Sequence, residues 1–385
     1  MSKSTDYKAP ASNRFLLISA TKKYLMIQQA RVFYALVLLM SISLSGYSQV
    51  KPQFRLYSDS TYKNIYTTYY DAPSQLFRET NDYSKDDHPY SYLWPLCALI
   101  QAGNEMEIMN KGDKYMDQVT AAIKKYYTTK SPAPGYKAYL GENDDRYIDD
   151  NQWIGLAYAD AYKRTSDKKY LNLAEEIYRF MMTGFDLNLG GGLYWRENDT
   201  TTKNTCSNGP GIVLALKLYN TTGNKKFLDT AMLLYNWTNN HLQAADGLFY
   251  DAIKVPGGKI DSAKYTYNTG TMLQANAMLY NITKNKKYLG EAQRIAAASA
   301  KQFYKNGHFP GNDWFNAVLL RGYEELFLID KNNTYITLMM NDADRKWQQR
   351  DSTNGLMGKE GRKKLLDQAG MLEIFARLAN LQTML

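Results

Sequence analysis

The sequence predicts an all-α protein built as an (α/α)6 barrel, in which six inner helices are surrounded by six outer helices. Three observations lead to this prediction. Helical pairs repeat along the chain, one helix of each pair is apolar nearly all round, and the 385 residues provide about six pairs of roughly 57 residues once an N-terminal leader is set aside. Hydrophobic residues make up 44% of the chain, which provides a sizeable core and argues against intrinsic disorder.

The outer helices are indicated by four similar segments. Each segment opens with a polar turn, continues with Lys and an aromatic residue, and then follows an apolar helical period. The aromatic residues are separated by 55, 57 and 61 residues, which is longer than the roughly 34-residue helical hairpins of common solenoids. The four aromatic residues are Tyr115, Tyr170, Phe227 and Tyr288. Two further outer helices are expected near Ser58–Tyr70 and Tyr335–Gln349.

The inner helices are indicated by segments that are apolar on all sides and rich in Ala, Gly, Leu and Met, as buried helices are. One such segment precedes each of the four polar turns, and two more follow near the C-terminus. The segments begin at Tyr92, Asp150, Asn208, Asn268, Asp313 and Leu366. An open solenoid is the alternative to a closed ring, but it would need polar capping repeats, and the last segment, "AGMLEIFARLA", is apolar.

The N-terminal 48 residues resemble a secretory leader. Basic residues precede an apolar run over Val32–Met40, and small residues then lead to a cleavage-site pattern before Gln49. The run is shorter than the roughly 20 residues of a membrane span, and Met26 is an alternative start. We therefore expect residues 1–48 to be a signal region, residues 49–385 to form a single domain, and the mature protein to be extracytoplasmic without a membrane span.

Charge and cysteine usage exclude several classes of function. The net charge of +9 falls to about +4 without residues 1–48, which hold six Lys or Arg and one Asp, and no stretch clusters basic and aromatic residues as a nucleic-acid surface would. Two cysteines, Cys97 and Cys206, and three histidines are scattered, so we expect no zinc site. A Cys97–Cys206 disulfide stays open. We expect no cofactor, no nucleic-acid partner and a monomer.

The unusual residues fall in the loops between each outer helix and the next inner helix, so the loops should open at one end of the barrel. The first of these residues are the adjacent Asp149 and Asp150 in "YIDDNQW". One reading is a helix N-cap followed by a first-turn acid. The other is a glycosidase pair, in which one carboxyl group is protonated and the other is ionised, as the repulsion between neighbouring like charges favours.

Aromatic and amide side chains in the same loops could bind a sugar. Tryptophans and tyrosines offer flat apolar faces, and asparagine amides both donate and accept hydrogen bonds; helix-end packing and capping are the alternatives. The expected substrate-binding residues are Asn151, Trp153, Trp195, Asn204, Ser207, Asn208, Asp251, Tyr267 and Asn268. The run Gly190–Gly192 indicates tight turns and lacks the Lys of a phosphate loop.

Several of these motifs, in this order, resemble glycoside hydrolase family 76. They are "YIDDNQWIGLAYADAY", "GGLYW", "KNTCSNGP", "ALKLY", "GLFYD", "YTYNTG", "WFNAVLLRGY" and "LLDQAGMLEIFARLA", and they extend from about Tyr92 to Leu378. The resemblance implies an (α/α)6 barrel with retaining, endo-acting α-1,6-mannanase activity on mannan. It implies Asp149 as the nucleophile, Asp150 as the general acid/base, and Asp251 as a contact to substrate hydroxyls. "YTYNTG" departs slightly from the usual "YTYNQG" of the family, which affects a local contact only.

Three other functions stay open at the level of sequence. A mannan transglycosidase would have the same fold and aspartates, and transfer products at high acceptor concentration would identify it. An exo-acting hydrolase would differ in the length of its products. A non-catalytic glycan-binding protein would bind an oligosaccharide without turning it over, with Asp149 and Asp150 serving as caps and hydrogen-bond acceptors.

Overall fold

The computed structural model describes residue 26 and residues 53–85, 88–141, 145–358 and 361–385. Residues Gln53–Leu385 form one compact unit. Except for Met26, the expected leader lies outside the described residues, so its cleavage stays a prediction. Within the described ranges, we find no helix that is both long enough and apolar enough to cross a membrane.

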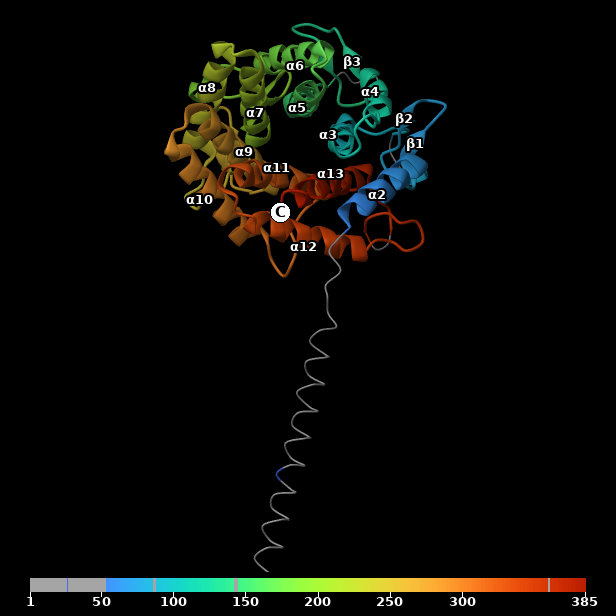
Figure 1. Cartoon of the computed structure of the whole chain (residues 1–385). Helices are drawn as coiled ribbons and strands as arrows, with labels where there is room; N and C mark the ends of the chain where they lie inside the picture. The colour runs from blue at the N-terminus through green and yellow to red at the C-terminus, as the bar shows by residue number, and fades with distance from the viewer. Residues whose placement is uncertain (1–25, 27–52, 86–87, 142–144, 359–360) are drawn as a thin grey trace, which may run out of the picture. The chain divides into compact units, whose positions relative to one another are not determined.

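The six inner helices form a closed ring. Each inner helix packs on the next one along the chain, and the last packs on the first (Figure 1). This closure confirms the predicted (α/α)6 barrel and shows that the open-solenoid alternative is wrong. The inner helices are α3 (Leu93–Met109), α5 (Ile148–Thr165), α7 (Thr205–Thr222), α9 (Thr266–Thr283), α11 (Asp313–Asp330) and α13 (Leu365–Gln382).

The outer helices cover the ring and bury only one face each. The sixth pair joins the two ends of the unit Gln53–Leu385, because α2 packs on α13. Phe54 of α2 stacks on Phe375 of α13 with ring centroids 6.2 Å apart. The outer helices are α2 (Phe54–Tyr69), α4 (Asp117–Lys124), α6 (Lys168–Met181), α8 (Lys225–Leu242), α10 (Lys286–Phe303) and α12 (Thr334–Gln348).

The polar turns before α6, α8 and α10 work as helix caps. In each, an Asp or Asn side chain accepts a hydrogen bond of 3.0–3.1 Å from the backbone N–H two residues on. The capping residues are Asp167, Asn224 and Asn285. The first repeat differs, because Asp113 lies one residue closer to the aromatic Tyr115 and accepts from its hydroxyl at 3.0 Å. The helix α4 therefore begins only at Asp117, later than the repeat predicts.

Small residues allow the inner helices to approach one another closely. A Cβ atom added to Gly322 of α11 would lie 2.6 Å from the backbone oxygen of Gly270 in α9. One added to Gly370 of α13 would lie 2.3 Å from the backbone nitrogen of Trp314 in α11. Backbones in such contact leave no room for a side chain, which explains the glycines in the inner segments.

Short strands extend the loops at the N-terminal ends of the inner helices. Two separate loops, before α7 and before α9, join in one antiparallel sheet of order β5-β6-β7-β8, with Asn204 of β6 opposite Ala252 of β7. Two small hairpins are β1 (Tyr70–Asp71) with β2 (Leu76–Phe77) and β3 (Tyr127–Thr128) with β4 (Gly135–Tyr136). The sheet strands are β5 (Tyr194–Arg196), β6 (Asp199–Asn204), β7 (Ala252–Lys254) and β8 (Ile260–Asp261).

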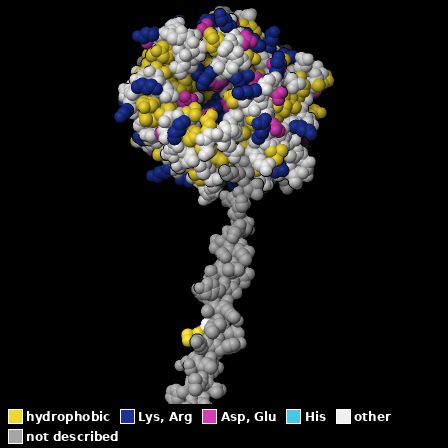
Figure 2. Space-filling view, in the orientation of Figure 1, with side chains coloured by type: hydrophobic (Ala, Val, Ile, Leu, Met, Phe, Trp, Pro, Cys, Tyr) yellow, Lys and Arg dark blue, Asp and Glu magenta, His cyan; other side chains and the backbone are white. Residues whose placement is uncertain are grey.

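The charged side chains of both signs are mixed on the surface. Figure 2 shows Lys and Arg side chains spread over one face, with acidic side chains between them near a central hollow. This face therefore carries interspersed charge, and its basic side chains do not gather into a single stripe.

Candidate active site

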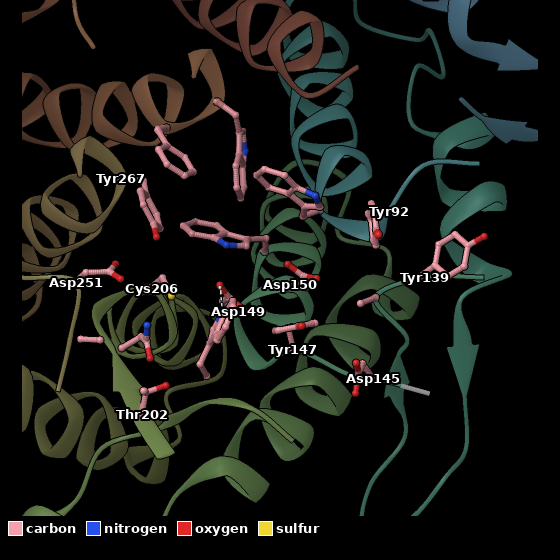
Figure 3. A pocket seen from close by; sticks show the side chains of 18 of the residues that line it. Tyr92, Tyr139, Asp145, Tyr147, Asp149, Asp150, Thr202, Cys206, Asp251 and Tyr267 are labelled. Atoms are coloured by element: carbon pink, nitrogen blue, oxygen red, sulfur yellow. Dashed lines mark hydrogen bonds between the residues drawn. The ribbon is translucent and has the colours of Figure 1, made fainter. Parts of the chain in front are cut away.

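A cavity of about 890 Å³ opens where the first turns of the inner helices meet the loops that precede them. The sequence predicts that the unusual residues meet at one end of the barrel, and the structure places most of them on the wall of this cavity (Figure 3). The predicted residues on the wall are Asp149, Asp150, Trp153, Trp195, Asn204, Asp251 and Tyr267.

The aspartate pair lies in the first turn of α5, at the centre of the cavity (Figure 3). The N-cap of this helix is Tyr147, and its side chain makes no capping hydrogen bond to the described residues. Neither aspartate is therefore the N-cap, and this part of the capping alternative is wrong. Both carboxyl groups still gain from the positive end of the helix dipole, but that gain does not require two of them.

The protein raises the pKa of both carboxyl groups, and it does so unequally. Burial raises the pKa of Asp149 to about 6, while hydrogen bonds from the Cys206 thiol and from Trp195 act in the opposite direction. Burial, together with the neighbouring Asp149 charge, raises the pKa of Asp150 well above its usual value. Desolvation and a like charge both disfavour the ionised form, so Asp150 keeps its proton at a pH where Asp149 has lost its own.

Trp195 is aimed at Asp149 by the strand that carries it. Tyr147 forms an isolated antiparallel bridge with Arg196 of β5, which ties the start of α5 to this strand. The indole Nε1 of Trp195 then donates to Asp149 Oδ2 at 3.3 Å, and its ring packs on Tyr147 with centroids 4.8 Å apart. The side chain is 40% exposed, so the indole can contact Asp149 and a ligand in the cavity together.

A further carboxyl group, that of Asp251, lies across the cavity from Tyr147, on the side of Asp149 (Figure 3). Its Oδ1 accepts from Asn268 Nδ2 at 3.0 Å, and burial raises its pKa while this hydrogen bond opposes the rise. The neighbouring Tyr267 stacks on Phe315 with centroids 4.0 Å apart. This side of the cavity thus offers a held carboxyl group beside a fixed aromatic ring.

The loop that carries β5 and β6 is organised around a buried lysine. The ammonium group of Lys203 donates to Asp186 Oδ1 at 2.6 Å, to the Asn188 carbonyl at 2.8 Å and to the Gly191 carbonyl at 2.6 Å. The predicted tight turn is present, since Gly192 has φ +84° and a Cβ there would lie 2.6 Å from the Trp237 ring. Lys203 lies one residue before Asn204, so this cage also fixes the cavity wall.

Four predicted substrate-binding residues are not on the cavity wall, namely Asn151, Ser207, Asn208 and Asn268, so their direct contact with substrate needs correction. The side chain of Asn151 bonds both backbone groups of Tyr136, and Asn208 does the same for Leu193. Ser207 is fully buried. The Asn151 and Asn208 side chains hold the loops in place, because their amide groups bond the backbone and not the cavity. The Ser207 hydroxyl is buried without a partner among the described residues.

Two predicted asparagines, Asn204 and Asn268, differ in whether they lie on the cavity wall. Asn204 is on the wall, although its Oδ1 is buried without a partner among the described residues. Asn268 is not on the wall and contacts the cavity through Asp251. Cys97 and Cys206 are both free and buried, so the disulfide left open by the sequence is not formed. The Cys97 thiol donates to the backbone oxygen of Asp150 at 3.2 Å.

Sequence analysis missed an aromatic floor and an aromatic rim. The floor combines the predicted Trp153 with Trp314, whose ring centroid lies 5.2 Å away, and with Trp94, 6.1 Å from Trp314. The rim contains Tyr92 and Tyr139. Tryptophan at the start of two inner segments was the available signal for the floor. Within the described ranges, no three His, Cys, Asp or Glu side chains are grouped to hold a metal ion.

Comparison with known proteins places this geometry among glycoside hydrolases. The model of glycosyl hydrolase family 76 matches residues 56–374. A family 76 glycoside hydrolase from a bovine Bacteroides thetaiotaomicron strain has a similar structure, with TM-score 0.81, 29% identity, and 86% of this chain and 79% of that chain covered. A family 76 mannosidase from Bacteroides thetaiotaomicron VPI-5482 gives TM-score 0.80 and 28% identity, with 86% and 100% covered.

A curated relative is named for its substrate. The mannan endo-1,6-alpha-mannosidase DCW1 of Saccharomyces cerevisiae is 29% identical over 229 residues, which cover 53% of this chain and 50% of the relative. The chain spans about half the length of the curated relatives that it matches.

Proposed function

The chain belongs to glycosyl hydrolase family 76, and from this premise we propose that it is an endo-acting hydrolase that cleaves α-1,6-mannosidic bonds in mannan. The observation that carries the proposal is the adjacent Asp149 and Asp150, whose pKa values are raised unequally in one cavity. Glycoside hydrolysis needs one carboxyl group that gives a proton and one that is ionised, and burial and mutual repulsion supply that difference here.

The reaction proceeds by double displacement with retention. Asp150 donates its proton to the glycosidic oxygen, and the carboxylate of Asp149 attacks the anomeric carbon, so the C–O bond to the leaving sugar breaks as the bond to Asp149 forms. The ionised Asp150 then takes a proton from a water molecule, and the water oxygen attacks the anomeric carbon. The bond between this carbon and Asp149 breaks, which releases the sugar and restores the Asp149 carboxylate. The second aspartate is thus needed for chemistry, since the helix α5 begins without either carboxyl group as its N-cap.

The substrate contacts follow from the residues on the cavity wall. Asp251, held by Asn268, accepts hydrogen bonds from mannose hydroxyls, and Asn204 contacts the sugar from the same wall. Trp195 and Tyr267 present ring surfaces to the sugar on the Asp149 side. We further propose that the leader pattern of residues 1–48 directs the protein out of the cytoplasm. The protein would then meet mannan outside the cytoplasm.

Product analysis on unbranched α-1,6-mannan tests the proposal. The wild-type protein should release short manno-oligosaccharides, whereas Asp149→Asn and Asp150→Asn should each lose nearly all activity and keep the fold. Asp229→Asn, a carboxyl change on the exposed surface of α8, is the control and should behave as wild type.

Each alternative gives a different result in the same assay. Longer products at high acceptor concentration would indicate a transglycosidase, and single sugars from the chain end an exo-acting enzyme. Binding of manno-oligosaccharide without any products would indicate a glycan-binding protein. Full activity in either aspartate variant would refute the role given to that residue.

A further inference from the structure

A cluster of three rings lies on the cavity wall beyond Asp150, and the proposed reaction does not use it. His88, Tyr92 and Tyr139 all line the cavity. Their ring centroids are 3.9 Å apart for His88 and Tyr139, 5.1 Å for His88 and Tyr92, and 5.4 Å for Tyr92 and Tyr139. We call these three residues the rim cluster.

The rim cluster presents ring surface more than polar groups. The Nε2 atom of His88 and the hydroxyl of Tyr92 lie 2.6 Å apart and share a hydrogen bond, so these polar atoms already have a partner. The Tyr92 side chain is nevertheless 37% exposed. Rings that brace one another lose little further freedom on binding, which lowers the entropic cost of holding a ligand.

The position of the rim cluster relative to the aspartates indicates which part of the substrate it would contact. In Figure 3, Tyr92 and Tyr139 lie on one side of the aspartate pair, beyond Asp150, whereas Asp251 and Tyr267 lie on the other side, beyond Asp149. In double displacement, the sugar that becomes attached to the nucleophile lies on the side of Asp149. The departing sugar lies on the side of the acid that protonates it.

We propose that the rim cluster is the binding subsite for the leaving part of the mannan chain. This assignment rests on the proposed function and names the wall that holds sugars past the cleaved bond. The apolar C–H face of a pyranose can pack on a tyrosine ring, whose face carries partial negative charge. Since an acceptor sugar enters from the same side in the second step, the rim cluster also sets how well the enzyme transfers mannose to another sugar.

Two substrates that differ only on the leaving side test this assignment in the full-length protein. Unbranched α-1,6-mannohexaose places sugars on both sides of the cleaved bond, whereas α-1,6-mannotriosyl fluoride places none on the leaving side. Tyr139→Ala should lower kcat/KM for the hexaose about tenfold, ~1.4 kcal/mol, and leave kcat/KM for the fluoride within about twofold. Tyr139→Phe, which keeps the ring, should behave as wild type.

Control variants separate this effect from a general loss. Tyr83→Ala removes an exposed tyrosine that is 54% accessible and not on the cavity wall. It should leave kcat/KM for both substrates unchanged. Tyr92→Ala, on a different segment, should repeat the loss on the hexaose. With α-1,6-mannobiose added as an acceptor, both rim variants should give less transfer relative to hydrolysis than wild type.

The outcomes distinguish this assignment from the proposed function. Equal losses on both substrates in both rim variants, or no loss on either, would overturn the subsite while leaving the mannanase proposal intact. A wild-type protein that turned over neither substrate would overturn the mannanase proposal, and the subsite with it.

Discussion

Replacing Trp195 with phenylalanine should move the acid limb of the pH–activity profile to higher pH. The indole Nε1 donates to Asp149 Oδ2 at 3.3 Å and stabilises the ionised form of this carboxyl group, which opposes the rise in pKa caused by burial. Phenylalanine keeps an aromatic ring on the cavity wall and removes only the donor. Asp149 should then hold its proton to higher pH, and the nucleophile should be lost earlier on acidification.

The size of the shift follows from the geometry of this hydrogen bond. A hydrogen bond to a charged group contributes about 1.5–3 kcal/mol. This one is longer than the usual ~2.7–3.2 Å, and Trp195 is 40% exposed, so water replaces part of the lost interaction. We therefore take about half of this free energy, ~0.7–1.4 kcal/mol, which corresponds to a shift of about 0.5–1 pKa unit. With Asp149 near pKa 6 in the wild type, the acid limb should lie about 0.5–1 unit higher in the variant.

The assay is kcat/KM on α-1,6-mannohexaose from pH 4 to 9, because its pH dependence reports the ionisation of the free enzyme. At pH 5 the variant should be about three- to tenfold slower than wild type relative to its own rate at the optimum. Trp314→Phe is the matched control, since Trp314 is on the cavity floor and its Nε1 has no partner among the described residues. An acid limb that stays in place, or moves to lower pH, in Trp195→Phe would refute this role of the indole.

Three further predictions concern stability. Gly322→Ala places a Cβ 2.6 Å from a backbone oxygen of α9. It should lower the free energy of unfolding by about 1–3 kcal/mol, which is measured as a lower midpoint of thermal unfolding. The control Gly290→Ala in α10, with open space around it, should be neutral or slightly stabilising. Lys203→Met removes the buried ammonium group that the Asp186 carboxylate and the Asn188 and Gly191 carbonyls share. It should lower the free energy of unfolding in urea by about 1–3 kcal/mol, and an unchanged value would contradict the cage. Burial raises the pKa of Glu105 to about 7 although its ion pair with Arg377 at 3.0 Å opposes the rise, so Glu105 holds its proton more tightly in the folded state than in the unfolded chain. Its contribution is full below about pH 4.5 and is lost as pH rises through 7; urea unfolding of Glu105→Gln should therefore show a smaller loss of stability between pH 5 and 8 than wild type, and an equal loss would count against this shift.

The helical layout could be predicted because the pattern of apolar and polar residues in each segment indicates how much of that helix is buried. The inner helices are apolar on all sides and carry glycines where backbones touch, as at Gly322 and Gly370. The outer helices carry a repeated cap, which sets their starts at Asp167, Asn224 and Asn285. The late start of α4 shows the limit of this reasoning, since moving one carboxyl group by one position turns a helix cap into a partner for a tyrosine hydroxyl.

The candidate site could be predicted only in its centre. The aspartate pair and Asp251 stand in motifs, but the sheet that joins the loop before α7 to the loop of Asp251 depends on pairing between β6 and β7, which are far apart in sequence. Asn151 and Asn208 were misassigned because an amide that holds a neighbouring loop has the same sequence signal as one that faces a ligand. Tyr139 had no signal, because its place on the cavity wall depends on the folded path of its loop.

The cavity wall around Asp150, whose burial raises the pKa of this carboxyl group, includes a floor that is supported from below. The guanidinium of Arg321 lies under Trp153 of the floor, with Cζ 5.4 Å from the ring centroid, and Arg321 makes paired bonds of 2.6 and 2.7 Å to the buried Glu373. A buried ion pair of this kind adds little net stability, because desolvation offsets the attraction. Its two directed bonds do fix the guanidinium under the indole, which shares the cavity wall with Asp150. The ion pair is therefore better explained by the placement of the cavity floor than by the free energy of unfolding.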